Sequence, residues 1–285
     1  MSLSSLPIFR FAPSPNGLLH LGHAYSALYT ARWAKAMGGV MLLRIEDIDT
    51  VRCRPEFVAA VFEDLKWLGL SWPEPVRIQS QHFDDYRAAA DQLRAKGLIY
   101  PCFCSRAEIR AASGRRTDPD GAPLYPGTCR HLSADQKMEN LRAGRPVQWR
   151  LDMNQAIEKT KEISIFEAMP TPKDKPVFRP ADPGRWGDVV IVRKDTPTSY
   201  HLSVVIDDAI QGVTHVTRGM DLYAATDIHV LLQALLKMES PIYTHHTLIV
   251  GEDAEKLSKS RGSESLASLR ALGITPEDIR AQLGF

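Results

Sequence analysis

The stretch that decides the fold is Arg10-Phe11-Ala12-Pro13-Ser14-Pro15-Asn16-Gly17-Leu18-Leu19-His20-Leu21-Gly22-His23. It starts in a short apolar run at 7–12 that predicts a strand, and two prolines and the Asn16-Gly17 pair break that strand. Apolar and small residues then recur at helical spacing over 21–37, and residues 40–45 predict a buried second strand. Strand, helix and strand in this order predict a right-handed crossover, and therefore an α/β fold with a parallel sheet.

Length and composition bound the remaining possibilities. A chain of 285 residues can bury one substantial core and carry a modest second domain, and 44% hydrophobic and 24% charged residues are typical of a soluble globular protein. Lys and Arg total 35 against 34 for Asp and Glu, so any RNA contact would come from a local basic patch. Without a secretory signal or an apolar run of membrane-spanning length, the sequence predicts a cytoplasmic protein with no membrane partner.

The rest of the chain divides into three predicted segments. Residues 1–99, which include further amphipathic helices at 55–69 and 83–97, form the first half of a catalytic domain. Turn formers at 113–121 predict an exposed loop within an inserted domain at 100–185. Residues 186–285 form the second half, in which we expect strands at 189–192, 204–206 and 247–250 and a helix at 224–237.

His20 and His23 lie on one face of the first turn of the expected helix. A helix N-terminus offers unpaired amide groups and a positive dipole end, which suit phosphate oxygens. Imidazole donors there could stabilise charge developing at phosphorus, while Gly22 leaves room for a nucleotide to approach the backbone. For so short a motif the commoner alternative is a pair of helix-start residues beside the core, but the strand before it and the helix after it favour a triphosphate site.

A second basic motif, Lys256-Leu257-Ser258-Lys259-Ser260, follows a turn late in the chain. Two ammonium groups three residues apart could stabilise a pentacovalent phosphate and the departing pyrophosphate. A solvated basic turn is the alternative. The order of the two motifs, separated by most of the chain, favours the nucleotide site.

Acidic and basic residues near the expected strand ends suggest an amino-acid pocket. Glu46, Asp47 and Asp49 follow the second strand, at the edge where parallel sheets bind ligands, and Glu46 is the candidate for a substrate ammonium group. As an alternative, Glu46, Asp47 and Asp49 could all be helix-capping acids or a metal site. An acidic substrate calls for arginine, and Arg10 and Arg218 are the candidates, although each alone could be a surface residue.

The first motif resembles the first signature of class I aminoacyl-tRNA synthetases of the glutamyl and glutaminyl branch. The second motif resembles their second signature, with Leu257 in place of the usual Met. This resemblance covers 10–260 and implies a Rossmann-type catalytic domain that uses ATP and Mg²⁺. It implies that His20, His23, Lys256 and Lys259 are catalytic, and that Gly22, His20, His23 and Lys259 bind ATP. The implied glutamate contacts are Arg10, Phe11, Ala12, Pro13, Ser14, Glu46, Tyr200 and Arg218.

Three of the four cysteines are clustered, while Cys53 stands apart and is expected to be a small buried hydrophobe. Cys102, Cys104 and Cys129 predict a closed, structural Zn²⁺ site, with unligated buried thiols as the alternative. Tyr125 and His131 are both possible fourth ligands. The pattern resembles the zinc site of glutamyl-queuosine tRNA(Asp) synthetases, in which Cys-x-Cys and Tyr-x-x-x-Cys supply the ligands, and this favours Tyr125. Nearby arginines either contact RNA phosphates or form a solvated face: Arg106, Arg110, Arg115, Arg116 and Arg130.

Only 25 residues follow Ser260 (285 minus 260), whereas glutamyl-tRNA synthetases continue into helical anticodon-binding domains. The resemblance therefore implies a relative of the glutamyl-queuosine tRNA(Asp) synthetases. These enzymes activate glutamate without tRNA and attach it to queuosine at the wobble position of tRNA(Asp). We expect a monomer. The alternatives are a truncated glutamyl-tRNA synthetase that charges a tRNA 3′ end, a non-catalytic zinc-stabilised RNA-binding protein, and a nucleotidylyltransferase that passes an adenylated acid to an amine.

Overall fold

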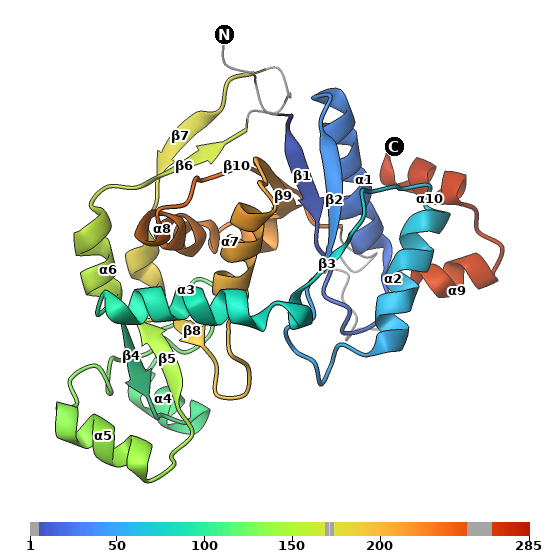
Figure 1. Ribbon diagram of the computed structural model, residues 1–285. Helices are drawn as coiled ribbons and strands as arrows, with labels where there is room; N and C mark the ends of the chain where they lie inside the picture. Colours follow the sequence, from blue (N-terminus) through green and yellow to red (C-terminus); the bar gives the residue numbers. More distant parts are fainter. Residues whose placement is uncertain (1–5, 169–170, 172–173, 250–263) are drawn as a thin grey trace.

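The computed structural model describes residues 6–168, 171, 174–249 and 264–285 (Figure 1). Its first sheet has the order β1-β2-β3 and contains β1 (Ile8–Phe11), β2 (Val40–Ile45) and β3 (Arg77–Ile78). All pairs are parallel, and α1 (Leu21–Ala36) connects the first two strands, as the sequence predicts. Two further helices, α2 (Pro55–Trp67) and α3 (Phe83–Ala95), lie close to the predicted ranges.

A second sheet, of order β7-β6-β10-β9, continues the parallel layer. It contains β6 (Ser164–Glu167), β7 (Val177–Pro180), β9 (His215–Gly219) and β10 (Ile242–His246). Strand β10 pairs in parallel with both β6 and β9, and β7 is the antiparallel edge. The N–H of Thr214 donates to the carbonyl of Ile8 at 2.9 Å. Early and late parts of the chain therefore lie side by side.

A third sheet is antiparallel and has the order β4-β5-β8. It contains β4 (Ile99–Cys102), β5 (Gln148–Leu151) and β8 (Val190–Val192). Together with α4 (Arg106–Ser113) and α5 (Ala134–Arg142) it forms a lobe that projects from the body in Figure 1. The predicted insertion, 100–185, supplies strands both to this lobe and to the second sheet, so its boundaries stay a prediction.

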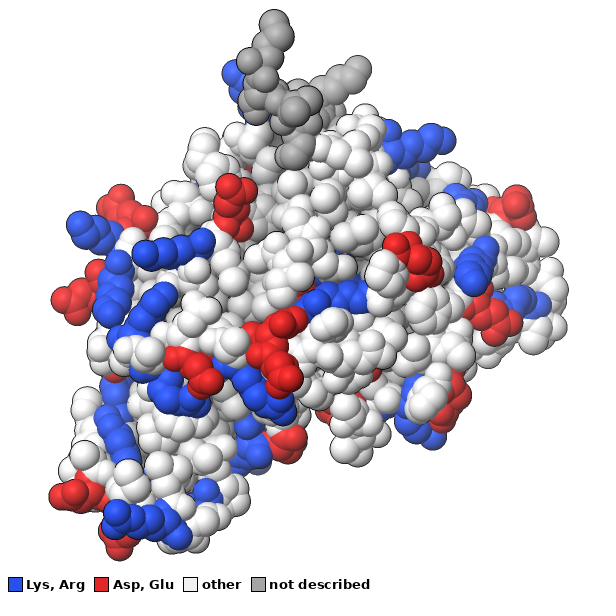
Figure 2. Space-filling model, viewed as in Figure 1, with Lys and Arg blue, Asp and Glu red and all other residues white. Residues whose placement is uncertain are grey.

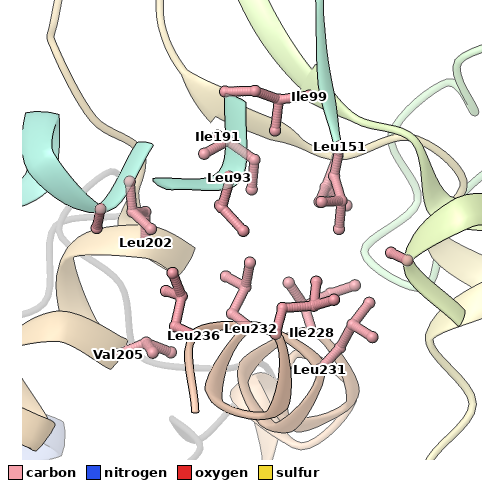
Figure 3. Close-up of a cluster of buried hydrophobic side chains, with 14 of the residues drawn as sticks. Leu93, Ile99, Leu151, Ile191, Leu202, Val205, Ile228, Leu231, Leu232 and Leu236 are labelled. Atoms are coloured by element: carbon pink, nitrogen blue, oxygen red, sulfur yellow. The ribbon is translucent and has the colours of Figure 1, made fainter. Parts of the chain in front are cut away.

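The largest buried cluster lies between the lobe and the body (Figure 3). Side chains of α3 and of the third sheet, including Leu93, Ile99 and Leu151, face Leu231 and Leu232 of α8 (Thr226–Leu236). Two more helices, α6 (Met153–Thr160) and α7 (Tyr200–Ile210), also contribute. Short 3-10 turns lie at Gln79–Gln81, Pro183–Trp186 and Met220–Leu222.

Two predicted strands are wrong. Residues 204–206 lie inside α7, whose residues Leu202 to Asp208 are all buried, and a helix buried on every side carries a continuous apolar run that looks like a strand. The strand expected at 247–250 is wrong over 247–249, because β10 ends at His246, and Val250 lies outside the described residues. Two helices that the sequence pattern did not predict, α9 (Leu266–Ala271) and α10 (Pro276–Leu283), pack against α2 and the first sheet.

Within the described part of the chain, no helix has both the length and the apolar character that crossing a bilayer requires.

Candidate active site

A cavity of about 800 Å³ opens where β1, β2 and β9 end. All the residues that the sequence assigns to glutamate line it, together with the three described residues assigned to ATP: Arg10, Phe11, Ala12, Pro13, Ser14, Glu46, Tyr200, Arg218, His20, Gly22 and His23. Lys256 and Lys259 lie outside the described residues. The structure therefore brings the first motif and the arginine pair into one cavity.

His20 and His23 form the start of α1. His20 is the N-cap, its Nδ1 accepts from the N–H of Gly22 at 3.1 Å, and Nδ1 of His23 accepts from the N–H of His20 at 3.2 Å. Because each Nδ1 is an acceptor, each neutral ring carries its proton on Nε2. The ring centroids are 3.9 Å apart. The helix cap thus holds two N–H donors together at the cavity wall.

Gly22 is constrained by its neighbour. A Cβ at this position would lie 3.0 Å from Cε1 and 3.2 Å from Nδ1 of His20, closer than ordinary van der Waals contact. Any side chain here would therefore displace the ring that caps the helix.

Arg10 lies at the cavity with its charge already compensated. It is 5% exposed, and its Nε donates to Asp208 at 3.0 Å. The same oxygen of Asp208 accepts from Nη1 of the fully buried Arg44 at 2.8 Å. Burial opposes ionisation of Asp208, but Arg10 and Arg44 lower its pKa overall. Two arginines from neighbouring strands thus share one buried carboxylate.

Glu46 follows β2 and forms the acidic side of the cavity. One of its oxygens accepts from Nη2 of Arg44 at 3.1 Å. Burial raises the pKa of Glu46 by more than Arg44 and Arg10 lower it. A cation in the cavity would therefore stabilise its ionised form. The other acids of this segment are structural, because Asp47 accepts from the N–H of Ser80 at 2.8 Å and Asp49 from Arg52, and neither lines the cavity.

Arg218 is 4% exposed, and within the described part of the chain its hydrogen-bond partners are neutral groups. Its Nη2 donates to Thr226 at 2.6 Å, its Nη1 to Nδ1 of His229 at 2.9 Å and its Nε to Nε2 of His245 at 3.2 Å. Among the described residues, no carboxylate pairs with it. Desolvation and the charge of Arg218 lower the pKa of His245 to about 3, which keeps that ring neutral.

Several cavity residues were missed by the sequence analysis. Tyr25 and Ser26 come from the next turn of α1, and His246 from the end of β10. Helical spacing from His23 could have indicated Ser26, which is three residues further on. No comparable pattern marks His246, because its place depends on how β10 pairs with β9.

The cysteine cluster lies in the lobe. The sulfur atoms of Cys102, Cys104 and Cys129 all lie within 4.8 Å of one another, and the last two are 3.5 Å apart. Four thiolate-type ligands around Zn²⁺ at about 2.3 Å would be separated by roughly 3.8 Å, so the spacing fits. The hydroxyl of Tyr125 lies 3.3 Å from the sulfur of Cys102 and accepts from the N–H of Cys129. His131 is exposed and is not part of the cluster.

Arg150, which the sequence analysis did not single out, adds positive charge to this cluster. It is 8% exposed, its Nε donates to the sulfur of Cys102 at 3.4 Å, and its guanidinium carbon lies 4.0 Å from the ring centre of Tyr125. Burial opposes ionisation of Cys102, but hydrogen bonds from Tyr125 and Gln148 together with Arg150 lower the thiol's pKa to about 7. The donor set therefore suits a metal that binds anionic sulfur.

The five arginines expected near RNA differ in their surroundings. Arg130 donates to the buried Asp188 at 2.9 Å and so has a structural role. The other four are exposed: Arg106, Arg110, Arg115 and Arg116. Figure 2 shows basic side chains over the lobe, with acidic ones among them.

Comparisons with known proteins identify the family. The family model described as "tRNA synthetases class I (E and Q), catalytic domain" matches residues 8–284. A glutamyl-Q tRNA(Asp) synthetase of Rhodobacter capsulatus is 44% identical over 283 residues, which cover 97% of this chain and 99% of that protein. A glutamate–tRNA ligase 2 of Nitrosococcus oceani is 39% identical over 276 residues, which cover 94% of this chain and 56% of that protein.

A solved structure shows the same fold. The glutamate tRNA ligase of Elizabethkingia meningosepticum, in complex with its amino acid, has a TM-score of 0.70 at 27% identity and covers 90% of this chain and 52% of that one. The family model implies the use of ATP and Mg²⁺. The chain therefore belongs to the class I tRNA synthetases of the E and Q type, a family of ligases that includes the glutamyl-Q tRNA(Asp) synthetase to which it is similar along almost its whole length.

Proposed function

We propose that the cavity binds glutamate and ATP, forms glutamyl adenylate without tRNA, and transfers the glutamyl group to queuosine at the wobble position of tRNA(Asp). The observation that carries this proposal is Arg218, which lines the cavity and whose buried guanidinium has no carboxylate partner among the described residues. A buried, uncompensated cation is costly, and an acidic ligand removes that cost.

Glutamate matches the charges around the cavity. Its ammonium group would lie against Glu46, whose pKa burial raises and a cation would lower. Its two carboxylates would lie near Arg10 and Arg218, and planar guanidinium groups bind carboxylates through paired hydrogen bonds. Tyr200, which begins α7 on the same wall, would close the pocket beside them.

The activation step forms one bond and breaks one. An oxygen of the α-carboxylate attacks the α-phosphorus of ATP, the bond from that phosphorus to the bridging oxygen breaks, and pyrophosphate leaves with the electron pair. The Nε2–H groups of His20 and His23 would stabilise the charge on the pentacovalent phosphorus. Lys256 and Lys259, which lie outside the described residues, would stabilise the same charge. Mg²⁺ would neutralise phosphate charge. No side-chain nucleophile is required.

The transfer step needs a hydroxyl acceptor. A hydroxyl of the queuosine cyclopentene ring attacks the carbonyl carbon of the mixed anhydride and forms an ester. The bond from that carbon to the phosphate oxygen breaks, and AMP leaves with the electron pair and takes up the hydroxyl proton. The relative that is similar over 99% of its own length is named a glutamyl-Q tRNA(Asp) synthetase, which supports this acceptor.

The lobe would support the RNA. Cys102, Cys104, Tyr125 and Cys129 would hold a structural Zn²⁺, which links β4 to the segment after α4. The exposed arginines of α4 and the loop after it would contact RNA phosphates. We expect the protein to act as a monomer in the cytoplasm.

Two measurements test the proposal. ATP–pyrophosphate exchange across the amino acids, with and without tRNA, should show exchange with glutamate alone and no need for tRNA. Transfer of labelled glutamate should then occur to an anticodon stem-loop fragment of tRNA(Asp) that carries queuosine, and not to the same fragment with guanosine. This fragment has no 3′ acceptor end, so acceptance excludes charging in the manner of a glutamyl-tRNA synthetase. Transfer only to the 3′ end of intact tRNA would support the truncated synthetase instead, and absence of exchange would support a non-catalytic RNA-binding protein.

A further inference from the structure

The guanidinium of Arg218 is held by a set of neutral acceptors that the reaction itself does not use. The set consists of Thr226 and His229 from α8 and His245 from β10, and it lies behind the cavity wall. His229 is 2% exposed. Arginine side chains in protein interiors are ordinarily paired with carboxylates, so an all-neutral set of partners calls for an explanation.

The hydrogen-bond directions determine the protonation of these rings. Arginine can only donate, so Nδ1 of His229 and Nε2 of His245 must both be unprotonated acceptors. The neutral His229 then carries its proton on Nε2, which lies 3.3 Å from Nδ1 of His201 and donates to it. The remaining proton of His201 is therefore on its own Nε2. One chain of contacts fixes the tautomers of three histidines.

The surroundings keep the rings neutral. Desolvation, followed by the charge of Arg218, lowers the pKa of His201 to about 4, and the pKa of His229 is also lowered. Behind the guanidinium, the ring centre of Tyr243 lies 5.1 Å from its central carbon and adds a cation–π contact without a formal negative charge. Three acids of this region pair with other arginines: Asp208 with Arg10 and Arg44, Glu46 with Arg44, and Asp227 with Arg179 and Arg185.

We propose that His229 and His245 are positioning residues for substrate selection, which orient Arg218 through neutral acceptors so that its charge is satisfied only by a carboxylate of the bound substrate. This inference rests on the proposed binding of glutamate in the cavity. A carboxylate in place of either histidine would orient the guanidinium equally well but would neutralise it before the substrate arrives. Because a neutral imidazole does not compensate the charge of Arg218, that charge remains available to bind a carboxylate of the substrate.

Two matched pairs of variants separate charge from shape. His229→Asn keeps a neutral acceptor near the position of Nδ1, and His229→Asp has the same size with a negative charge. His245→Gln and His245→Glu make the same comparison at Nε2, from a different element. In ATP–pyrophosphate exchange we expect the Asn and Gln variants to stay near the wild-type KM for glutamate. The Asp and Glu variants should raise that KM about 100-fold, as the loss of a buried charge pairing does, with the KM for ATP changed less than about twofold.

The decisive result is the difference in the KM for glutamate between each acidic variant and its neutral partner. If each acidic variant and its neutral partner have the same KM for glutamate, or if the KM values for glutamate and ATP rise together, the inference is wrong. Melting temperatures identify any variant that fails to fold, and the second pair then provides the comparison.

A measurement without substrate separates this inference from the proposed function. Ring ¹⁵N chemical shifts of the wild-type protein at pH 6 should show His229 and His245 as neutral, with unprotonated Nδ1 and Nε2 respectively. Protonated rings would overturn the inference whatever amino acid the protein activates. If the rings are neutral but the protein shows no glutamate-dependent exchange, the arrangement of neutral acceptors around Arg218 is supported and glutamate is rejected as the substrate.

Discussion

His20 forms an isolated antiparallel bridge with Ser265. Beside it, the N–H of Leu266 donates to the carbonyl of Leu19 at 2.8 Å. On the other side of the undescribed segment 250–263, Ile249 lines the cavity. The described residues on the two sides of 250–263 therefore lie at the cavity wall and beside the residue that caps α1.

A methyl group at Gly22 should disturb catalysis more than binding. In Gly22→Ala the new Cβ would meet His20, which must move, so the two imidazoles lose their alignment. We expect kcat for pyrophosphate exchange to fall roughly 10- to 100-fold, as misplaced catalytic groups cause, with little change in the KM for glutamate. Lys35→Ala, at an exposed site of the same helix, is the control and should match the wild type. An unchanged kcat in Gly22→Ala would argue against a catalytic position for His20.

Removing the charge of Glu46 should weaken the binding of the amino group. Glu46→Gln keeps the size of the side chain, and we expect the KM for glutamate to rise on the order of 10- to 100-fold because a partly buried ion pair is lost. The KM for ATP should stay the same. Asp49→Asn, which changes an acid outside the cavity, serves as the control. Equal effects from the two substitutions would remove Glu46 from the substrate site.

The cysteine cluster should contain about one zinc ion per chain in the purified protein. Cys104→Ser should lower that content to near zero and reduce the melting temperature, because β4 and the segment around Cys129 lose their common ligand. Cys53→Ser, at the cysteine outside the cluster, should keep the zinc. A wild-type protein that contains no zinc and is unaffected by a chelator would show that the thiols are unligated.

Acid should destabilise the protein through its buried histidines. The pKa values of His201 and His245 are lowered to about 4 and about 3, below about 6.5 for an unfolded histidine. Between those values the unfolded chain binds more protons, so the free energy of unfolding falls as the pH falls through this window. From pH 7 to pH 5 each ring should remove about 2 kcal/mol. Thermal melts across this range should show a smaller slope in His245→Gln than in the wild type, and equal slopes would contradict the prediction.

Asp207 should be one of the most sensitive positions for stability. Its fully buried carboxylate accepts from Arg77 at 2.6 Å, from Gln79 at 2.7 Å and from Tyr86 at 2.9 Å. Asp207→Asn leaves Arg77 without its buried charge partner, and we expect a loss of about 3–5 kcal/mol in the free energy of unfolding. Urea denaturation measures this loss, with Asp84→Asn, at an exposed surface ion pair, as the control. If Asp207→Asn loses no more free energy of unfolding than Asp84→Asn, the hydrogen-bond network of Asp207 does not stabilise the protein.

The local pattern of the first 45 residues predicted both strands, the helix and their parallel pairing, because period and turn residues are encoded locally there. The same reasoning failed at α7, where burial on all sides removed the amphipathic signal. It also could not find the neutral partners of Arg218. His229 and His245 are ordinary residues in the sequence, and only the packing of α8 against β10 brings them to one guanidinium.

The hydrogen bond between Thr214 and Ile8 limits the order in which parts of the protein can fold during translation. During synthesis the first strand leaves the ribosome long before its late neighbour β9 exists, and the hydrogen bonds of Arg10 form only after Asp208 and Thr217 are translated. Contacts so distant along the chain form slowly, and the lobe between them has time to collapse first. A nascent chain stalled before β9 is translated would therefore carry β1 paired with β2 along one edge, while its other edge lacks the neighbour that completes the layer.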